Sequence, residues 1–302
     1  MSSVMKGLTT CSIGFRRLCC GFVACGLAFA LQGAVADTLV GTLPGEIAVD
    51  SRGTAGYSIP LVVPPGTAGM VPTLGLTYTS GGGNGLLGVG WSISGLSAIT
   101  RVPATKFHDD FDDPVDYDNN DRFMLDGQRL ILVNGENYGD PDSEYRTEVE
   151  SFQKIIAKGT SVSGPAWFEV RSKDGLIREY GKTGDARYRP EIESALFWSI
   201  NKVTDSAGNY INFQYYKAES EVWGRHRPTK IEYTGNTSEG LTPYSTISFE
   251  YEPRPDLHTT FAASGGMRHD KRLKKIVMKV GTTYVRDYRL VYELSPISKR
   301  WI

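Results

Sequence analysis

The feature that most constrains this sequence is a dense run of glycines placed directly before a tryptophan. Six of the ten residues from 81 to 90 are glycine, and Trp91 follows them. Glycine is favoured where the backbone takes a positive φ or lies close to another group. Apolar residues alternate with small or polar ones on both sides of the run, at Leu76 and Tyr78 before it and at Trp91 and Ile93 after it, with the period of a β-strand. The stretch therefore predicts a strand, a glycine turn and a second strand, with these structural residues: Gly81, Gly82, Gly83, Gly85, Gly88, Gly90 and Trp91.

The same run resembles a nucleotide-binding loop only superficially. Residues 83–88 match the spacing GxGxxG. A dinucleotide site needs that spacing between a strand and a helix, whereas residues 91–94 have the alternation of a strand. A Rossmann fold is therefore disfavoured, and the sequence predicts no cofactor.

The rest of the chain reads as a series of hairpins. Apolar residues alternate around Asp126-Gly127, Asp174-Gly175 and residues 205–209, and Asp-Gly is a strong signal for a hairpin turn. We predict an all-β fold of many antiparallel hairpins without a long helix, and residues 144–158 fit a helix or a strand equally well. The turn residues predicted to be structural are Asp126, Gly127, Asp205, Gly208 and Asn209.

A segment rich in aspartate, residues 105–121, permits two interpretations. Clustered carboxylates are suitable ligands for calcium, and the candidate ligands are Asp116, Asp118 and Asn120. The EF-hand pattern fails, however, because Asp121 occupies the position that needs glycine and Gly127 the position that needs glutamate. The alternative is a solvated surface loop, since Asp and Asn are common in turns.

The N-terminal segment has the order of a secretory signal. Three basic residues precede an apolar run, residues 18–31, and Ala34-Val35-Ala36 follows it. This predicts a signal peptide over residues 1–36, a domain over residues 37–302 and a secreted protein. A membrane anchor and a lipoprotein signal at Cys25 are the alternatives. All four cysteines lie before residue 37, so the mature chain is predicted to fold without disulfides.

Charge and histidine spacing limit the other functions. The formal net charge of −1 gives no reason to expect nucleic acid or an anionic membrane as a partner. We expect no membrane insertion by the mature chain. The four histidines, His108, His226, His258 and His269, lack metal-site spacing. A catalytic triad would need distant residues to meet in the fold.

Residues 45–101 resemble the opening motif of the SpvB/TcaC N-terminal domain family. The similarity continues through the segments DRFMLDGQRLI, DGLIREYG, FWSINKVTDSAGNYINFQYY and ISFEYEPRPD. This family includes the Salmonella virulence plasmid 65 kDa B protein and the B components of insecticidal toxin complexes. The resemblance implies the start of a β-strand shell related to Rhs/YD repeats, which encloses a toxic C-terminal segment. Family members continue well beyond this length, so residues 37–302 are expected to be an N-terminal β domain that is incomplete at its carboxyl end.

The leading hypothesis is therefore a secreted structural module of a toxin, without catalytic activity of its own. The resemblance implies two partners: a downstream Rhs-type or toxin C component chain, and a toxin translocation pore. Two alternatives remain, an extracellular carbohydrate- or protein-binding β module and a cryptic hydrolase.

Overall fold

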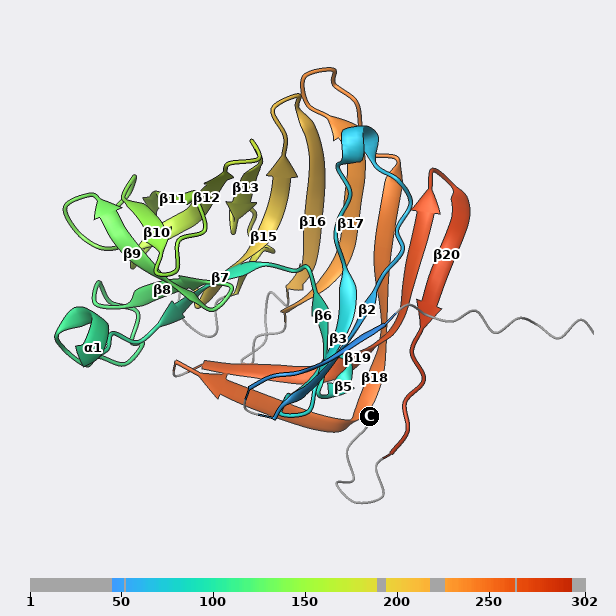
Figure 1. Ribbon diagram of the computed structural model, residues 1–302, viewed down its shortest axis with the longest axis horizontal. Helices are drawn as coiled ribbons and strands as arrows, with labels where there is room; N and C mark the ends of the chain where they lie inside the picture. The colour runs from blue at the N-terminus through green and yellow to red at the C-terminus, as the bar shows by residue number, and fades with distance from the viewer. Residues whose placement is uncertain (1–44, 52, 189–193, 218–225, 264, 295–302) are drawn as a thin grey trace, which may run out of the picture. The chain divides into compact units, whose positions relative to one another are not determined.

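The computed structural model describes residues 45–51, 53–188, 194–217, 226–263 and 265–294 (Figure 1). The chain divides into two units, Met1–Thr42 and Leu43–Ile302, and every described residue belongs to the second. The predicted signal peptide therefore lies outside the described residues. No helix in the described part of the chain is long and apolar enough to span a membrane.

Strands make up almost all of the regular structure, which confirms the all-β prediction. The first ten strands are β1 (Glu46–Val49), β2 (Ala55–Pro60), β3 (Gly75–Thr79), β4 (Asn84–Gly85), β5 (Gly88–Val89), β6 (Trp91–Ser94), β7 (Ala98–Val102), β8 (Arg122–Leu125), β9 (Gln128–Asn134) and β10 (Glu144–Thr147). The remaining ten are β11 (Gln153–Thr160), β12 (Pro165–Ser172), β13 (Ile177–Tyr180), β14 (Arg187–Tyr188), β15 (Phe197–Thr204), β16 (Asn209–Lys217), β17 (His226–Asn236), β18 (Ser245–Ala262), β19 (Gly265–Val280) and β20 (Thr283–Arg289). Two single turns of helix complete the described elements, η1 (Thr67–Gly69) and α1 (Lys106–Asp109).

The predicted hairpins form where the turn dipeptides stand. Asp126-Gly127 joins β8 to β9, Asp174-Gly175 lies between β12 and β13, and residues 205–208 join β15 to β16. The segment 144–158, for which helix and strand were equally good, forms β10 and most of β11 with a turn between them. The helical spacing of its apolar residues is interrupted there, because Phe152 takes a positive φ of 55°.

The large sheet has a closed part and an open part. Strands β7 to β13 pair in sequence order, and β15 pairs with both β7 and β13, so these eight strands close into a ring. From β15 the sheet continues through β16, β17, β18 and β19 to β20 (Figure 1). All of these pairings are antiparallel.

An aromatic cluster fills the ring. Trp198 is fully buried, and the rings of Phe123 and Phe168 meet it edge-on, with centroids 5.5 and 5.0 Å away. Tyr145 and Tyr180 are buried beside them. Buried residues alternate with less buried ones along β8 and β10, as expected for strands with one face on a core, whereas β11 and β15 contain runs of consecutive buried residues.

The smaller sheet, in the order β1-β2-β3-β6, covers the open part of the large sheet (Figure 1). Leu61 and Leu74 join the same core cluster as Ile231 and Ile247. Hydrogen bonds tie the two layers together: the Tyr233 hydroxyl donates to the carbonyl of Pro64 (2.9 Å), and the Val62 amide donates to the hydroxyl of Tyr288 (2.9 Å). The glycine run lies at one end of this smaller sheet, so its position is set by both layers.

Candidate functional site

The glycine run is a small hairpin inside a larger one. β3 and β6 pair as predicted, with Tyr78 opposite Trp91. The residues between these two strands, 80–90, are not a single tight turn, however, because β4 and β5 pair with each other within the run. The amide of Gly90 donates to the carbonyl of Gly83 (2.9 Å), and the amide of Thr79 donates to the carbonyl of Gly90 (2.9 Å). The predicted strand, turn and strand are thus present, with a second hairpin as the turn.

Three of the glycines are required by the backbone. Gly88 and Gly90 have positive φ values of 88° and 81°, a region that other residues enter at a cost. A Cβ on Gly90 would lie 2.5 Å from the ring of Tyr78. A Cβ on Gly82 would lie 2.8 Å from the Cα of Gly90. The close approach of these two chain segments explains why small residues are concentrated here.

The other predicted residues of the run are less constrained. A Cβ on Gly81 or Gly83 would meet nothing within 4 Å, and one on Gly85 would make an ordinary contact at 3.5 Å. Trp91 is half-buried and packs against the core, with its ring 5.4 Å from that of Tyr78. The fully buried tryptophan is Trp198 in the ring of strands.

An arginine and an aspartate on β18 fasten the glycine run to the large sheet. The buried guanidinium of Arg254 donates to the carbonyl of Gly85 (2.9 Å) and to the amide oxygen of Asn84 (2.6 Å). It also pairs with both carboxylate oxygens of Asp256, each at 3.0 Å. The Asn84 amide completes the group by donating to Asp256 (2.8 Å). We call these four residues, Asn84, Gly85, Arg254 and Asp256, the loop clamp.

The electrostatics of the loop clamp favour its charged form. Burial alone would raise the pKa of Asp256, but hydrogen bonds from Arg254 and Asn84 and the positive charge of Arg254 lower it to about 2. Next to the loop clamp, the carbonyl of Leu86 accepts from the Leu273 amide (2.8 Å) and Leu87 is buried in the core. A network in which every charge is paired fixes one geometry, so the clamp is suited to hold two layers in register.

The predicted turn residues make similar local networks. Asp126 and Gly127 both have positive φ, 49° and 82°, as a type I′ hairpin turn requires. The carboxylate of Asp126 accepts from the hydroxyl of Ser97 (2.6 Å) and from the amide of Ala98 (3.0 Å). This turn therefore also holds the start of β7.

The turn at residues 205–209 is connected to its neighbour. The Asp205 carboxylate accepts from the amide of Asn209 (2.8 Å) and from its side chain (2.8 Å), and Gly208 has a φ of 87°. The side chain of Asn236, at the end of β17, donates to the Asn209 side chain (2.9 Å). These contacts give the predicted residues a structural role in joining two hairpins.

The aspartate-rich segment gathers carboxylates at the surface. Oxygen atoms of Asp113, Asp116 and Asp118 lie within 4.8 Å of one another. Asn120, the third candidate ligand from the sequence, instead donates through its backbone amide to Asp118 (2.7 Å). Exposed acidic groups often meet in this way without a metal, so calcium binding stays a prediction.

Asp121, at the end of that segment, belongs to a buried ion pair. Its carboxylate lies 2.7 Å from the guanidinium of Arg101, and both side chains are almost fully buried. Burial raises the pKa of Asp121, while Arg101 and the amides of Asp116 and Tyr117 act against that rise. Arg101 also donates to the carbonyl of Ala195 (2.8 Å). The pair anchors the loop to the ring of strands.

Two histidine arrangements were hidden from the sequence. His258 and His269 stand opposite each other on β18 and β19, with their rings stacked 4.6 Å apart. Burial, the neighbouring His258 and Arg254 lower the pKa of His269 to about 4. Stacked imidazoles do not converge on a single point, which argues against a shared metal ion.

The second arrangement has the outline of a catalytic triad. The hydroxyl of Thr105 lies 3.0 Å from Nδ1 of His108, and Nε2 of His108 lies 3.1 Å from the Glu148 carboxylate. The side chain of Glu148 is 47% exposed, whereas the carboxylate of a triad is normally buried so that it fixes the imidazole. The arrangement is a surface hydrogen-bond network at the start of α1.

The sequence did not identify the loop clamp or the Arg101–Asp121 pair. Arg254 and Asp256 lie about 170 residues from Asn84 along the chain, so no local pattern connects them. The only available signal was the segment ISFEYEPRPD, which contains both residues and was part of the family resemblance.

Comparison with protein families and curated proteins identifies relatives of this chain. Residues 49–241 match the family model described as Salmonella virulence plasmid 65kDa B protein. The mono(ADP-ribosyl)transferase SpvB of Salmonella typhimurium is 30% identical over 189 residues, which cover 54% of this chain and 30% of the relative. The mono(ADP-ribosyl)transferase SpvB of Salmonella choleraesuis is 30% identical over 185 residues, with the same coverage of both chains. The match thus spans less than a third of the length of these curated relatives.

Solved structures share the fold. The N-terminal domain of effector protein SpvB from Salmonella typhimurium has a TM-score of 0.61 and 21% identity, over 80% of this chain and 95% of that domain. The TcdB2-TccC3 structure has a TM-score of 0.67 and 19% identity, over 86% of this chain and 16% of that one. The Photorhabdus luminescens Tc holotoxin pore gives a TM-score of 0.67 and 18% identity, over 86% of this chain and 15% of that one. These likenesses establish the fold, and they confirm the prediction that it is the β fold of toxin-complex proteins.

Proposed function

Because this chain belongs to the SpvB family and corresponds to its N-terminal module, we propose that it is a non-enzymatic scaffold which supplies the first strands of a β-strand shell around a toxin. The family and the fold make it a toxin-related structural module. The encapsulating role and the absence of catalysis are the steps that we add.

The observation that carries this proposal is the open end of the large sheet. β20 pairs with β19 along one edge, and no described strand pairs with its other edge. Tyr284 and Val285 on β20 are about half exposed, at 48% and 49%. An unpaired strand edge is a template for another strand. At its other end the same sheet closes on itself through β15, so β20 is the edge at which a further strand would pair.

The partner that fits this edge is a chain with further β-strands. This fold covers about a sixth of the matched chains in the structures described as TcdB2-TccC3 and the Photorhabdus luminescens Tc holotoxin pore. We propose a downstream Rhs-type or toxin C component chain as the partner, and a toxin translocation pore as the next component. A signal peptide over residues 1–36 and secretion to the extracellular region belong to this proposal.

The proposed lack of catalysis is based on which region of the relatives this chain matches. The curated relatives are named mono(ADP-ribosyl)transferases, but the solved relative that matches over 95% of its length is the N-terminal domain of SpvB. The triad-like group of Thr105, His108 and Glu148 lies at the surface, with the side chain of Glu148 47% exposed. We therefore assign the transferase activity of the relatives to a part of those proteins outside the matched region.

Association through β20 provides the test. The variant Val285→Lys places a charge on the exposed strand edge, a device that blocks pairing between edges. We expect it to weaken binding to a purified toxin C component chain of the TccC3 type about tenfold or more in titration calorimetry. Val133→Lys on β9 is the matched control, since Val133 is 53% exposed and β9 belongs to the ring of strands and does not pair with β20. Equal binding by both variants would contradict the proposal, and so would NAD turnover by the purified chain.

A further inference from the structure

Three positive charges stand in a row on the outer face of the ring. Lys154 on β11 is directly opposite Arg171 on β12. The pairing of Tyr145 with Ile155 places Arg146 on β10 opposite Lys154 on its other side. Adjacent strands are about 4.8 Å apart, and like charges in directly opposite positions destabilise a sheet. The row therefore needs compensation by negative charge.

Carboxylates of the chain pair with two of the three cations in the row. Lys154 pairs with Glu144, and Arg171 pairs with Glu169 at 2.7 Å. Arg146 instead donates to the backbone carbonyl of Gln153 (3.2 Å) and forms no ion pair with a described residue.

A fourth cation, Lys173, lies two residues beyond Arg171. Its ammonium group is 5.1 Å from the centre of the Phe152 ring, and it has no carboxylate partner among the described residues. Two of the four cations, Arg146 and Lys173, are therefore available to an anionic ligand.

An aromatic side chain is held out beside these charges. Phe152 is 66% exposed and has a positive φ of 55°, a conformation that is unfavourable for a bulky residue. Its amide is held by the carboxylate of Glu150. Backbone strain of this kind is concentrated at functional sites, and most of the Phe152 side chain is left in contact with solvent.

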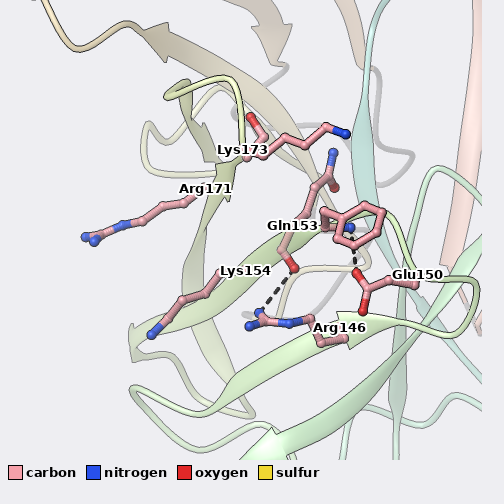
Figure 2. Close-up of a pocket in the computed structure, with 8 residues that line it drawn as sticks. Arg146, Glu150, Gln153, Lys154, Arg171 and Lys173 are labelled. Atoms are coloured by element: carbon pink, nitrogen blue, oxygen red, sulfur yellow. Dashed lines mark hydrogen bonds between the residues drawn. The ribbon is translucent and has the colours of Figure 1, made fainter.

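These residues line one cleft (Figure 2). Its volume is about 370 Å³, within the range of small-ligand sites. Figure 2 shows Arg146, Lys154 and Arg171 on neighbouring strands, with the ends of Lys154 and Arg171 directed to one side and the end of Lys173 to the other. Phe152 also lines the cleft. The cleft thus combines four cations, one carboxylate and one exposed aromatic face.

We propose that this cleft binds an acidic saccharide, with sulfate or carboxylate groups on the cations and a sugar ring against Phe152. Guanidinium and ammonium groups make charge-assisted hydrogen bonds with such anions. The aromatic ring provides a flat apolar surface for a sugar face, which an acidic peptide would not require. Nucleic acid is disfavoured because the chain has a net charge of −1, whereas nucleic-acid-binding domains are strongly basic. This inference is independent of the shell proposed above, because the cleft is on the ring of strands and not at β20.

Titration calorimetry with defined oligosaccharides tests it. The probes are a heparin-derived tetrasaccharide for sulfate, tetragalacturonate for carboxylate, and neutral maltotetraose. We expect the purified chain to bind one or both acidic probes and not the neutral one. The double variant Arg146→Gln/Lys173→Gln removes the two cations without a carboxylate partner and is expected to bind about tenfold or more weakly. The matched control Lys158→Gln/Lys182→Gln removes the same charge outside the cleft and is expected to bind like the unchanged chain.

Phe152→Gly separates sugar recognition from charge and from folding. Glycine accepts the positive φ, so the variant is expected to fold at least as stably while it loses affinity for the acidic saccharide. Tetraglutamate is the control ligand. The proposal is overturned if neither acidic saccharide binds, or if the cleft and control double variants bind equally. It is also overturned if tetraglutamate binds as tightly as the saccharides and Phe152→Gly changes nothing, since the cleft would then be an acidic-peptide site.

Discussion

The glycine run predicts a sharp difference between two substitutions only seven residues apart. Gly90→Ala places a Cβ at a backbone φ of 81°, 2.5 Å from the ring of Tyr78 and 2.9 Å from the carbonyl oxygen of Thr79. Gly83→Ala adds the same methyl group in open space, with nothing within 4 Å. The two variants differ in geometry but not in composition, so the comparison isolates the role of the backbone.

The expected magnitude follows from two costs. A left-handed φ costs a non-glycine residue about 1–2 kcal/mol. The contacts of the new Cβ at Gly90 with Tyr78 and Thr79 are comparable to overpacking in a core, which costs about 1–3 kcal/mol. Together they lower the free energy of unfolding by about 2–5 kcal/mol, a large part of the roughly 5–15 kcal/mol of a typical domain. Valine at Gly88 or Gly90 is expected to abolish soluble folding, since a branched side chain is still less compatible with positive φ.

Thermal unfolding followed by circular dichroism measures the effect. For a domain of this size, 1 kcal/mol corresponds to about 2–4 °C in Tm, so Gly90→Ala is expected to melt about 4–20 °C below the unchanged chain. Gly83→Ala is expected to melt within about 2 °C of it, as surface substitutions usually do. Equal melting temperatures for the two variants would refute the argument that the run is built around its positive-φ glycines.

The buried titratable groups give three more predictions. The pKa values of His226 and His269 are both lowered to about 4, so below about pH 6.5 the unfolded chain binds more protons than the folded chain, and the free energy of unfolding should fall between pH 6.5 and pH 4. The double variant His226→Gln/His269→Gln should flatten this pH dependence in urea denaturation. An unchanged pH dependence would contradict the assignment to these two histidines. Asp256, with a pKa lowered from 3.8 to about 2, should stabilise the fold above about pH 4 and lose that contribution toward pH 2, so Asp256→Asn should remove this acid-dependent step. Asp121→Asn should destabilise the chain by about 3–5 kcal/mol in urea denaturation, because it leaves the Arg101 charge buried and unpaired; a loss below about 1 kcal/mol would show that the pair is not a structural anchor.

The local features of the fold were predictable because their cause is local. Asp126-Gly127 forms a hairpin turn since both residues accept positive φ. The turn at residues 205–209 closes through the side chain of Asp205 on its own backbone. In both turns the side chains and backbone angles that stabilise the turn belong to the turn residues themselves, so a short stretch of sequence is enough to predict it.

The closure of the ring was not predictable. β15 meets β7 about 100 residues earlier in the chain and β13 about 20 residues earlier, and alternation says only that each is a strand. The same limit explains the two tryptophans. Trp91 stood out because of the glycines before it, whereas Trp198 is fully buried because the ring closes around it.

The loop clamp depends on such long-range pairing, and the row of cations depends on the exact register of consecutive hairpins. The loop clamp needs β18 to return to the glycine run. The row of cations needs β10, β11 and β12 to align in one register. The helical spacing of apolar residues within 144–158 concealed the turn at Phe152, a residue that lines the cleft.

The central claim is that a strand of a toxin-complex partner chain pairs with the open edge of β20. Hydrogen exchange of the amides in Thr283–Arg289 tests it most directly, in the purified chain alone and with a toxin C component chain of the TccC3 type. The account predicts that the outward-facing amides of β20 exchange rapidly in the free chain and become protected in the complex, as a new strand pairs with them. A complex that forms while β20 exchange stays unchanged would contradict it.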